Sequence, residues 1–151
     1  MTKKKGGKNY KQGEYEVKNK EKFVGTKNPR FLSSFELQCF LYFDNNPNVI
    51  EWGSENVVVK YYDYLKEKYR RYMVDVYVKY KDRKGDIHTE LVEIKPYNQT
   101  LPPNKGKKRQ DVFEQQQMTY ITNQEKWQSA KQYAEERGWK FRVITEYDIF
   151  R

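Results

Sequence analysis

The 151-residue sequence predicts an α/β domain in which helices flank a mixed sheet. Residues 71–80 and 88–95 alternate between apolar and polar side chains, which is typical of strands. Helical patterns precede and follow these two segments. The last strand, at 140–146, is reached through a helical crossover and is therefore expected to lie parallel to a neighbour. The predicted order is α-β-β-β-α-β, in one domain without internal repeats.

The first helix is expected at residues 34–44, with Phe40 and Phe43 in its apolar stripe and Pro47 after its end. Glu36 has two interpretations. It belongs to a capping box, in which its carboxylate bonds back to the Ser33 amide, or it points inward as an acidic group of a metal site. Taken alone, the helix favours the cap.

A strand at 56–61 comes next, and a hairpin is expected to follow it. Gly85 suits the left-handed position of a short loop between Asp82 and Asp86. A hairpin with this loop pairs Val76 with Val92, and therefore places two further residues, Asp75 and Glu93, opposite each other. The period of two also puts Lys95 on the same face as Glu93.

Asp75 and Glu93 would then hold two carboxylates roughly 5 Å apart, measured between their Cβ atoms. Like charges in this arrangement repel. A hard divalent cation such as Mg²⁺ would explain the pair, with Lys95 beside the metal. The alternative is a solvated hairpin face on which three charges only keep the strand soluble.

After the hairpin, helices are expected at 111–121 and 123–137, with a capping-box sequence restarting the second one at Thr122. Gly138 is expected to cap its C-terminus. Apolar residues recur every seven positions in this region, which predicts core packing: Phe113, Tyr120, Trp127 and Ala134.

The net charge of +9 is unevenly distributed. Residues 1–30 carry ten Lys or Arg and three Glu, which predicts a flexible basic arm. A second basic cluster follows the 88–95 strand, at Lys105, Lys107, Lys108 and Arg109. Such clusters indicate contact with nucleic acid, although a solubility tail remains the alternative for the arm. No apolar run approaches the ~20 residues that span a membrane, so a cytoplasmic protein is expected.

Val74-Asp75, followed after 18 residues by Glu93-Ile-Lys95, resembles the PD-(D/E)XK nuclease signature. The resemblance implies a restriction-endonuclease-like core over residues 31–151, with residues 1–30 as the arm. The first helix of that family carries a metal-site glutamate, so the resemblance favours Glu36 as a ligand. Gln116 and Tyr120 resemble a Gln-x-x-x-Tyr element of the following helix and are expected near DNA.

A wider resemblance covers nearly the whole chain, including Ser33-Ser-Phe-Glu-Leu37, Ser54-Glu55 and Arg70-Arg-Tyr-Met-Val-Asp75. These stretches resemble the head-completion nucleases of T-even-type tailed phages, which are related to the Tn7-type transposition endonuclease subunit. The resemblance implies a Mg²⁺-dependent DNA endonuclease, with exonuclease activity as a second expectation and Mn²⁺ as a substitute metal. It would act on packaged DNA before tail joining, in the host cytoplasm or the virion head, with portal or head proteins as partners.

In the expected mechanism, Asp75 and Glu93 bind Mg²⁺, and the Ile94 carbonyl and Glu36 complete the protein ligands. Lys95 orients the attacking water or neutralises charge on the phosphate. Other basic residues are expected to hold flanking phosphates without reading sequence, namely Arg70, Arg71 and the cluster at 105–109. His88 is expected to be structural. Two alternatives remain: a transposition or repair nuclease, and a head-assembly protein without catalysis.

Overall fold

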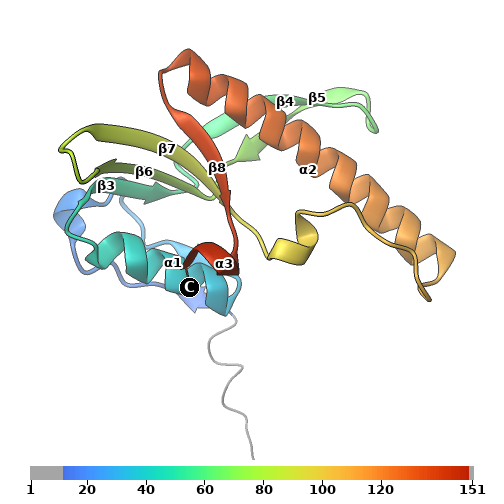
Figure 1. Cartoon of the computed structure of the whole chain (residues 1–151), viewed down its shortest axis with the longest axis horizontal. Coiled ribbons are helices and arrows are strands. Elements are labelled where there is room, and N and C mark those ends of the chain that lie inside the picture. The colour runs from blue at the N-terminus through green and yellow to red at the C-terminus, as the bar shows by residue number, and fades with distance from the viewer. Residues whose placement is uncertain (1–11, 150–151) are drawn as a thin grey trace, which may run out of the picture.

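The computed structural model describes residues 12–149, and a four-stranded mixed sheet lies at its centre (Figure 1). Its spatial order is β3 (Val49–Ser54), β6 (Val76–Lys81), β7 (Ile87–Ile94) and β8 (Lys140–Ile144). The pairs β3–β6 and β6–β7 are antiparallel, and β8 runs parallel to β7. The prediction of a mixed sheet with a parallel last strand is therefore confirmed. β3, however, was not predicted.

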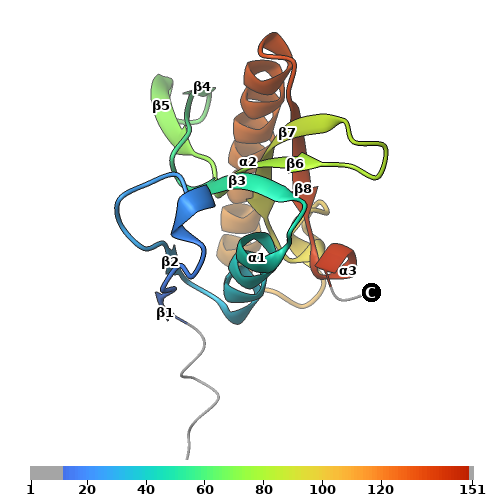
Figure 2. The same ribbon diagram turned by 90° about the vertical axis from the view of Figure 1, so that its left-hand side faces the viewer.

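Two long helices, α1 (Ser34–Asn45) and α2 (Gln110–Glu136), cover opposite faces of this sheet (Figure 2). α1 packs its phenylalanines against Trp52, Val76 and Val92, whereas α2 packs Trp127 and its alanines against the face that contains Leu91. Successive strand residues point to opposite faces, so the neighbours Leu91 and Val92 enter different cores. This architecture is the restriction-endonuclease-like core expected from the sequence.

The predicted strand at 71–80 is divided in the structure. β4 (Val58–Asp63) and β5 (Lys68–Met73) form a separate antiparallel hairpin, and β6 begins only at Val76. The division reflects a change of pairing partner: β5 pairs with β4, whereas β6 pairs with β3 and β7. The two residues before β6 still bond to the segment that precedes β4. The Val74 amide donates to the Val57 carbonyl (3.0 Å), and the Asp75 carbonyl accepts from the Glu55 amide (3.2 Å).

The two helices predicted at 111–121 and 123–137 are one continuous helix, α2. The predicted restart at Thr122 is wrong, because 110–136 contains neither glycine nor proline and the backbone hydrogen bonds continue through the capping-box sequence. The predicted C-cap is confirmed. Gly138 has a positive φ of 74°, and its amide donates to the Glu135 carbonyl (3.1 Å).

Part of the predicted basic arm is folded. β1 (Gly13–Glu14) pairs with β2 (Arg30–Phe31), and a short 3₁₀ helix, η2 (Lys20–Lys22), lies between them. Tyr15 and Val17 are buried in the core on the α1 side. Residues 12–30 are therefore a packed segment of the domain rather than a flexible arm that ends at residue 30. Residues 1–11 of the predicted arm lie outside the described residues.

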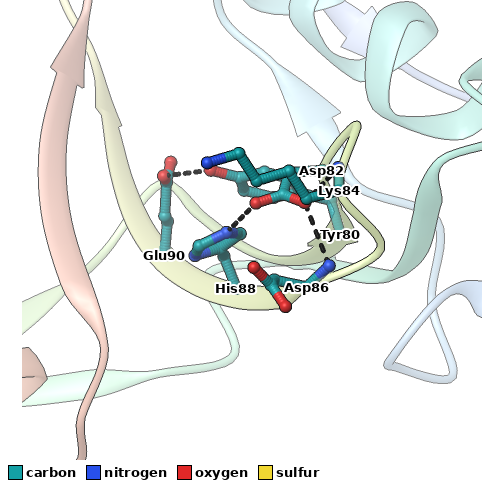
Figure 3. A network of polar contacts seen from close by, with 6 residues as sticks. All are labelled: Tyr80, Asp82, Lys84, Asp86, His88 and Glu90. Carbon is teal, nitrogen blue, oxygen red and sulfur yellow. Dashed lines mark hydrogen bonds and ion pairs between the residues drawn. The ribbon is translucent and has the colours of Figure 1, made fainter.

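The β6–β7 hairpin closes as predicted, with Val76 opposite Val92. Figure 3 shows the polar contacts around the loop of this hairpin. Asp82 holds the loop: its Oδ1 accepts from the Lys84 and Asp86 amides (2.9 Å each), and its Oδ2 lies 2.6 Å from His88 Nε2. His88 therefore belongs to the hairpin, which fits its predicted structural role. The remaining short helices are η3 (Tyr97–Gln99) and α3 (Glu146–Ile149). No helix within residues 12–149 is both long and apolar enough to cross a membrane.

Candidate active site

Asp75 and Glu93 lie at one end of the central sheet, where the predicted register brings them together. Val76 and Val92 are the last paired residues at this end of the hairpin, and Asp75 and Glu93 directly adjoin that pair. Asp75 is half-buried at the β5–β6 junction, and its Oδ2 accepts a hydrogen bond from the Ile94 amide (2.8 Å). Glu93 is buried, with 6% of its surface exposed. Two carboxylates thus share one partly enclosed position.

The carboxylate of Glu93 is held from two sides. Lys95 Nζ lies 3.2 Å from Glu93 Oε2, as the common face of the two residues predicts. The Tyr72 hydroxyl donates a hydrogen bond to the other oxygen, Oε1. Tyr72 was not predicted as a site residue, because its position in the alternating segment is that of any core tyrosine. The hydroxyl orients the carboxylate, while the ammonium supplies the nearest positive charge.

Two carboxyl groups of this cluster have raised pKa values. Burial, and secondly the negative charge of Glu93, raise the pKa of the Asp75 carboxyl well above its usual range. Burial also raises the pKa of Glu36, and the charges of Glu55 and Glu93 add to this effect. Lys95 opposes the rise at both carboxyls but does not cancel it. The site therefore has more negative charge than its own lysine neutralises.

Glu36 takes part in the N-terminal cap of α1 and also lines the pocket of Asp75. The Ser33 hydroxyl accepts from the Glu36 amide (3.1 Å), so the N-cap is confirmed. The Glu36 carboxylate accepts a hydrogen bond from the Leu32 amide (2.8 Å) and not from that of Ser33, so the predicted capping-box bond is wrong by one residue. The same side chain lines a pocket together with Asp75.

That pocket has a volume of about 210 Å³ and lies between the start of α1, the end of β3 and the β5–β6 junction. Besides Glu36, Asp75 and Ile94, it is lined by Arg30 and Glu55, which the sequence analysis did not assign to the site. Glu55 has a positive φ of 54° at the end of β3. Its only sequence signal was the Ser54-Glu55 stretch within the wider resemblance. Arg30 had no signal beyond its charge.

The carboxylate oxygens of Asp75, Glu93 and Glu36 are of the kind that bind a hard divalent cation. In this structure, however, the three carboxylates do not point towards one common position. Within residues 12–149, no three His, Cys, Asp or Glu side chains form a group that could hold a metal ion. The reason lies in their hydrogen bonds: Glu36 is turned to the Leu32 amide, and Glu93 to Tyr72 and Lys95. A cation between Asp75 and Glu93 would relieve the repulsion that raises the pKa of Asp75. Oxygen ligands fit Mg²⁺, provided that Glu36 and Glu93 rotate towards it.

The structure separates the two arginines that were predicted to contact DNA. They are neighbours on β5 and point to opposite faces of its hairpin. Arg70 Nη1 lies 3.1 Å from Oδ2 of the buried Asp63, so Arg70 has an internal partner. Arg71 is exposed and forms no ion pair with another residue of the 12–149 region.

The second basic cluster precedes and begins α2. Lys108 Nζ donates to the Gln116 side chain (2.6 Å), Arg109 pairs with Asp111 (2.8 Å), and Lys107 is exposed. Lys105 Nζ donates to the Lys108 carbonyl (2.9 Å).

Gln116 and Tyr120 share one face of α2, as predicted, and line a different pocket of about 570 Å³ together with the 98–108 segment. This pocket shares no lining residue with the pocket of Asp75.

The sheet, its two flanking helices and the carboxylate cluster at the sheet end define a protein of the restriction-endonuclease-like class. Residues 46–146 match the family described as "TnsA-like endonuclease N terminal", and the chain belongs to this family. The matched range includes Asp75, Glu93 and Lys95, but begins after Glu36.

The chain is also 37% identical, over 142 residues, to the "Head completion nuclease" of Enterobacteria phage T4. This similarity covers 89% of the present chain and 90% of the phage protein.

Proposed function

We propose that this protein is a Mg²⁺-dependent DNA endonuclease of the PD-(D/E)XK type that acts on packaged phage DNA during head completion. The observation that supports this most strongly is the position of Asp75, Glu93 and Lys95. They lie together at one sheet end in a chain of an endonuclease family. An exonuclease activity of the same site is a secondary part of the proposal.

Asp75 and Glu93 would hold the Mg²⁺ ion, with the Ile94 carbonyl and Glu36 as further ligands, and Mn²⁺ would substitute for it. When bound, such an ion lowers the pKa of a water molecule and stabilises negative charge on a phosphate. Tyr72 keeps one Glu93 oxygen in a fixed orientation through its hydrogen bond. Glu36 would exchange its bond to the Leu32 amide for the ion, which is a rotation within the same pocket.

Lys95 would act on the DNA itself. Its ammonium lies 3.2 Å from Glu93 and is one-fifth exposed, so it can reach a phosphate at the mouth of the site. There it would donate a hydrogen bond to the attacking water or to a phosphate oxygen and offset the charge that develops during hydrolysis. A permanent positive charge at this distance also limits repulsion between the carboxylates and the DNA backbone.

Flanking phosphates would be held by exposed basic residues, which position the DNA without reading its sequence. Arg71 suits this role better than Arg70, because Arg70 already neutralises Asp63. The 105–109 cluster would extend the contact along the start of α2, where Lys107 is exposed. Gln116 and Tyr120 would add contacts from their pocket on the same helix.

The role in head completion is supported by the name of the phage relative and by the nearly full-length similarity to it. On this basis the partners would include portal or head proteins, and the protein would act in the host cytoplasm during assembly, with the virion head as a second location. The family description supports an alternative, a transposition-type endonuclease without a virion role.

A cleavage assay tests the enzymatic part of the proposal. Supercoiled plasmid is incubated with the purified full-length protein in Mg²⁺, in EDTA, and with the Asp75→Asn variant in Mg²⁺. We expect nicked and linear products only in the first reaction. Intact plasmid in all three reactions would contradict the proposal. Cosedimentation of the protein with phage heads then separates head completion from the transposition-type alternative.

A further inference from the structure

Among residues 12–149, one face of the β4–β5 hairpin is largely open to solvent, although Val58 and Lys60 at one of its edges also line a pocket with α2. Val59, Tyr61 and Tyr72 point inward and pack with Trp127 and Ala130 of α2. The opposite face, called here the outer face, consists of three cross-strand pairs and one residue of the turn: Val58 with Met73, Lys60 with Arg71, Tyr62 with Tyr69, and Tyr64. Figures 1 and 2 show this hairpin projecting beside α2, away from α1.

The outer face has an unbalanced pair of positive charges. Lys60 and Arg71 are directly opposite in the antiparallel register, and like charges at such positions destabilise a sheet. Neither residue forms an ion pair with any other part of the 12–149 region. The inner face differs, because Asp63 there neutralises Arg70. An anion bound on the outer face would remove the repulsion.

Exposed aromatic rings lie next to these charges. Tyr62 packs edge-on against Tyr64 and Tyr69, with ring centroids 4.7 and 5.0 Å apart. Tyr64 is 69% exposed and Tyr69 is 64% exposed, so both present ring surface to the solvent. Lys60 Nζ lies 4.6 Å from the centroid of Tyr69, which joins the aromatic group to the basic pair.

The position of the outer face relative to the carboxylate of Asp75 is fixed by the backbone. β5 leads through Val74 into Asp75, and the backbone bonds from Val74 to Val57 and from Glu55 to Asp75 hold the base of the hairpin. Arg71 precedes Asp75 by four residues, a separation of at most about 13 Å along an extended chain. A strand bound on the outer face would therefore pass within a few nucleotides of Asp75.

We propose that the outer face binds a DNA strand with unpaired bases next to the cleavage site. Lys60 and Arg71 contact its phosphates, and Tyr64 and Tyr69 stack on its bases. Basic and aromatic side chains together are the usual means of binding single strands, since a duplex hides its base faces except at its ends. The inference rests on the proposed DNA nuclease function and narrows its substrate to DNA with a single-stranded tail or gap.

Equilibrium binding in EDTA tests this inference separately from cleavage. A blunt duplex and the same duplex with a short thymidine tail are titrated by fluorescence anisotropy with the full-length protein. We expect the wild type to bind the tailed duplex more tightly. Tyr64→Ala and Tyr69→Ala should each lose roughly 5- to 100-fold in affinity for the tailed duplex, with little change for the blunt one. Tyr69→Phe should retain the preference, and Tyr42→Ala, at an exposed tyrosine of α1, is the matched control.

The charge part of the inference has its own pair of variants. Arg71→Gln should weaken binding and reduce the slope of log affinity against log salt by about one, whereas Arg83→Gln, in the distant β6–β7 loop, should not.

Equal affinity of the wild type for both DNAs, or an unchanged preference in both tyrosine variants, would overturn the inference. Normal DNA binding by these variants with loss of association with phage heads would also overturn it, and would assign the outer face to a protein partner. Plasmid cleavage by the wild type, measured in parallel, reports on the proposed function alone.

Discussion

At the scale of single residues, the main feature of the site is the electrostatic repulsion between the carboxylates of Asp75 and Glu93. Asp75 accepts from the Ile94 amide and Glu93 accepts from Tyr72, so each is fixed by a hydrogen bond while their charges repel. Without a cation, this arrangement raises the pKa of Asp75 and lowers the stability of the fold above the usual aspartate pKa. The cation proposed to bind between them would remove this repulsion.

The first prediction concerns this pair. Asp75→Asn or Glu93→Gln should abolish cleavage, because each removes a charged ligand while keeping an acceptor for its hydrogen-bond donor. The melting temperature of the metal-free protein should be unchanged or slightly higher, since the repulsion is lost. Plasmid cleavage and thermal unfolding measure the two effects, with Asp86→Asn in the distant hairpin loop as a control. Cleavage at the wild-type rate by either variant would exclude the site.

A second prediction separates the two roles of Glu36. Glu36→Gln retains an oxygen that accepts from the Leu32 amide, so stability should be nearly unchanged while cleavage is lost. Glu36→Ala should also lose cleavage and in addition cost about 1 kcal/mol of stability, because the start of α1 loses its capping-box partner. If the Gln variant cleaves normally and only the Ala variant melts earlier, Glu36 is a cap and not a ligand.

Alternation along the chain was sufficient to predict Asp75, Glu93 and Lys95, because a period of two assigns each residue to a face. Alternation gave no indication of Tyr72. A tyrosine whose hydroxyl bonds to a site residue occupies the same inward position as a tyrosine that only packs in the core. Nor did alternation indicate Glu55. That residue enters the site only through the turn at the end of β3, which depends on tertiary contacts.

At the scale of elements, the junction at Val74-Asp75 shows what a local pattern cannot predict. Residues 71–81 alternate without interruption, yet the chain leaves β4 at Met73 and joins β3 and β7 at Val76. Which strand a segment pairs with depends on residues far away in the sequence, so the apolar–polar alternation does not reveal it. β3 was missed for a related reason. Its pairing shifts register between Val49 and Glu51, so the strand does not keep a strict period of two.

A further element-scale contact supports a third prediction. Fully buried Asp44, near the end of α1, accepts hydrogen bonds from the Tyr15 hydroxyl and from the amides of Lys18 (2.9 Å) and Asn19 (3.2 Å). Burial acts to raise the pKa of Asp44, but these bonds outweigh it and hold the pKa below its usual value of 3.8. The carboxylate therefore fastens the 12–30 segment to the helix.

Because the pKa is lowered in the folded state, this stabilisation exists above pH 3.8 and is lost as the pH falls through the folded-state value. Asp44→Asn should thus reduce the free energy of unfolding by about 1–3 kcal/mol at neutral pH, and by progressively less below about pH 4. Urea unfolding across this pH range measures the difference. A loss of equal size near pH 3 and pH 7 would show that the charge of Asp44 does not matter.

At the scale of the whole molecule, the excess of positive charge favours a polyanionic partner. The net charge is +9, and five lysines lie within residues 1–11. A deletion that tests this segment should stop at residue 11, because Tyr15 and Val17 belong to the core and their removal would disturb the fold.

The fourth prediction follows. If four of these five lysines contact phosphates, deletion of residues 1–11 should flatten the log–log salt dependence of DNA binding by about 3 to 4. Affinity should fall similarly for all sequences. Cleavage at saturating DNA should stay nearly unchanged, because Asp75, Glu93 and Lys95 lie on the folded sheet. Normal DNA binding by the truncated protein, combined with loss of association with phage heads, would instead make the segment a protein-docking element.

We expect the end of the central sheet to hold one divalent cation between Asp75 and Glu93. A crystal of the full-length protein soaked in Mn²⁺ tests it most directly, because the anomalous signal of manganese locates the ion independently of any assay. We expect one strong anomalous peak in contact with both carboxylates, with Glu36 turned away from the Leu32 amide. That peak should be absent in Asp75→Asn crystals soaked in the same way. A peak elsewhere, or none at the carboxylates of a protein that cleaves DNA in Mn²⁺, would show that Asp75 and Glu93 do not hold the metal ion.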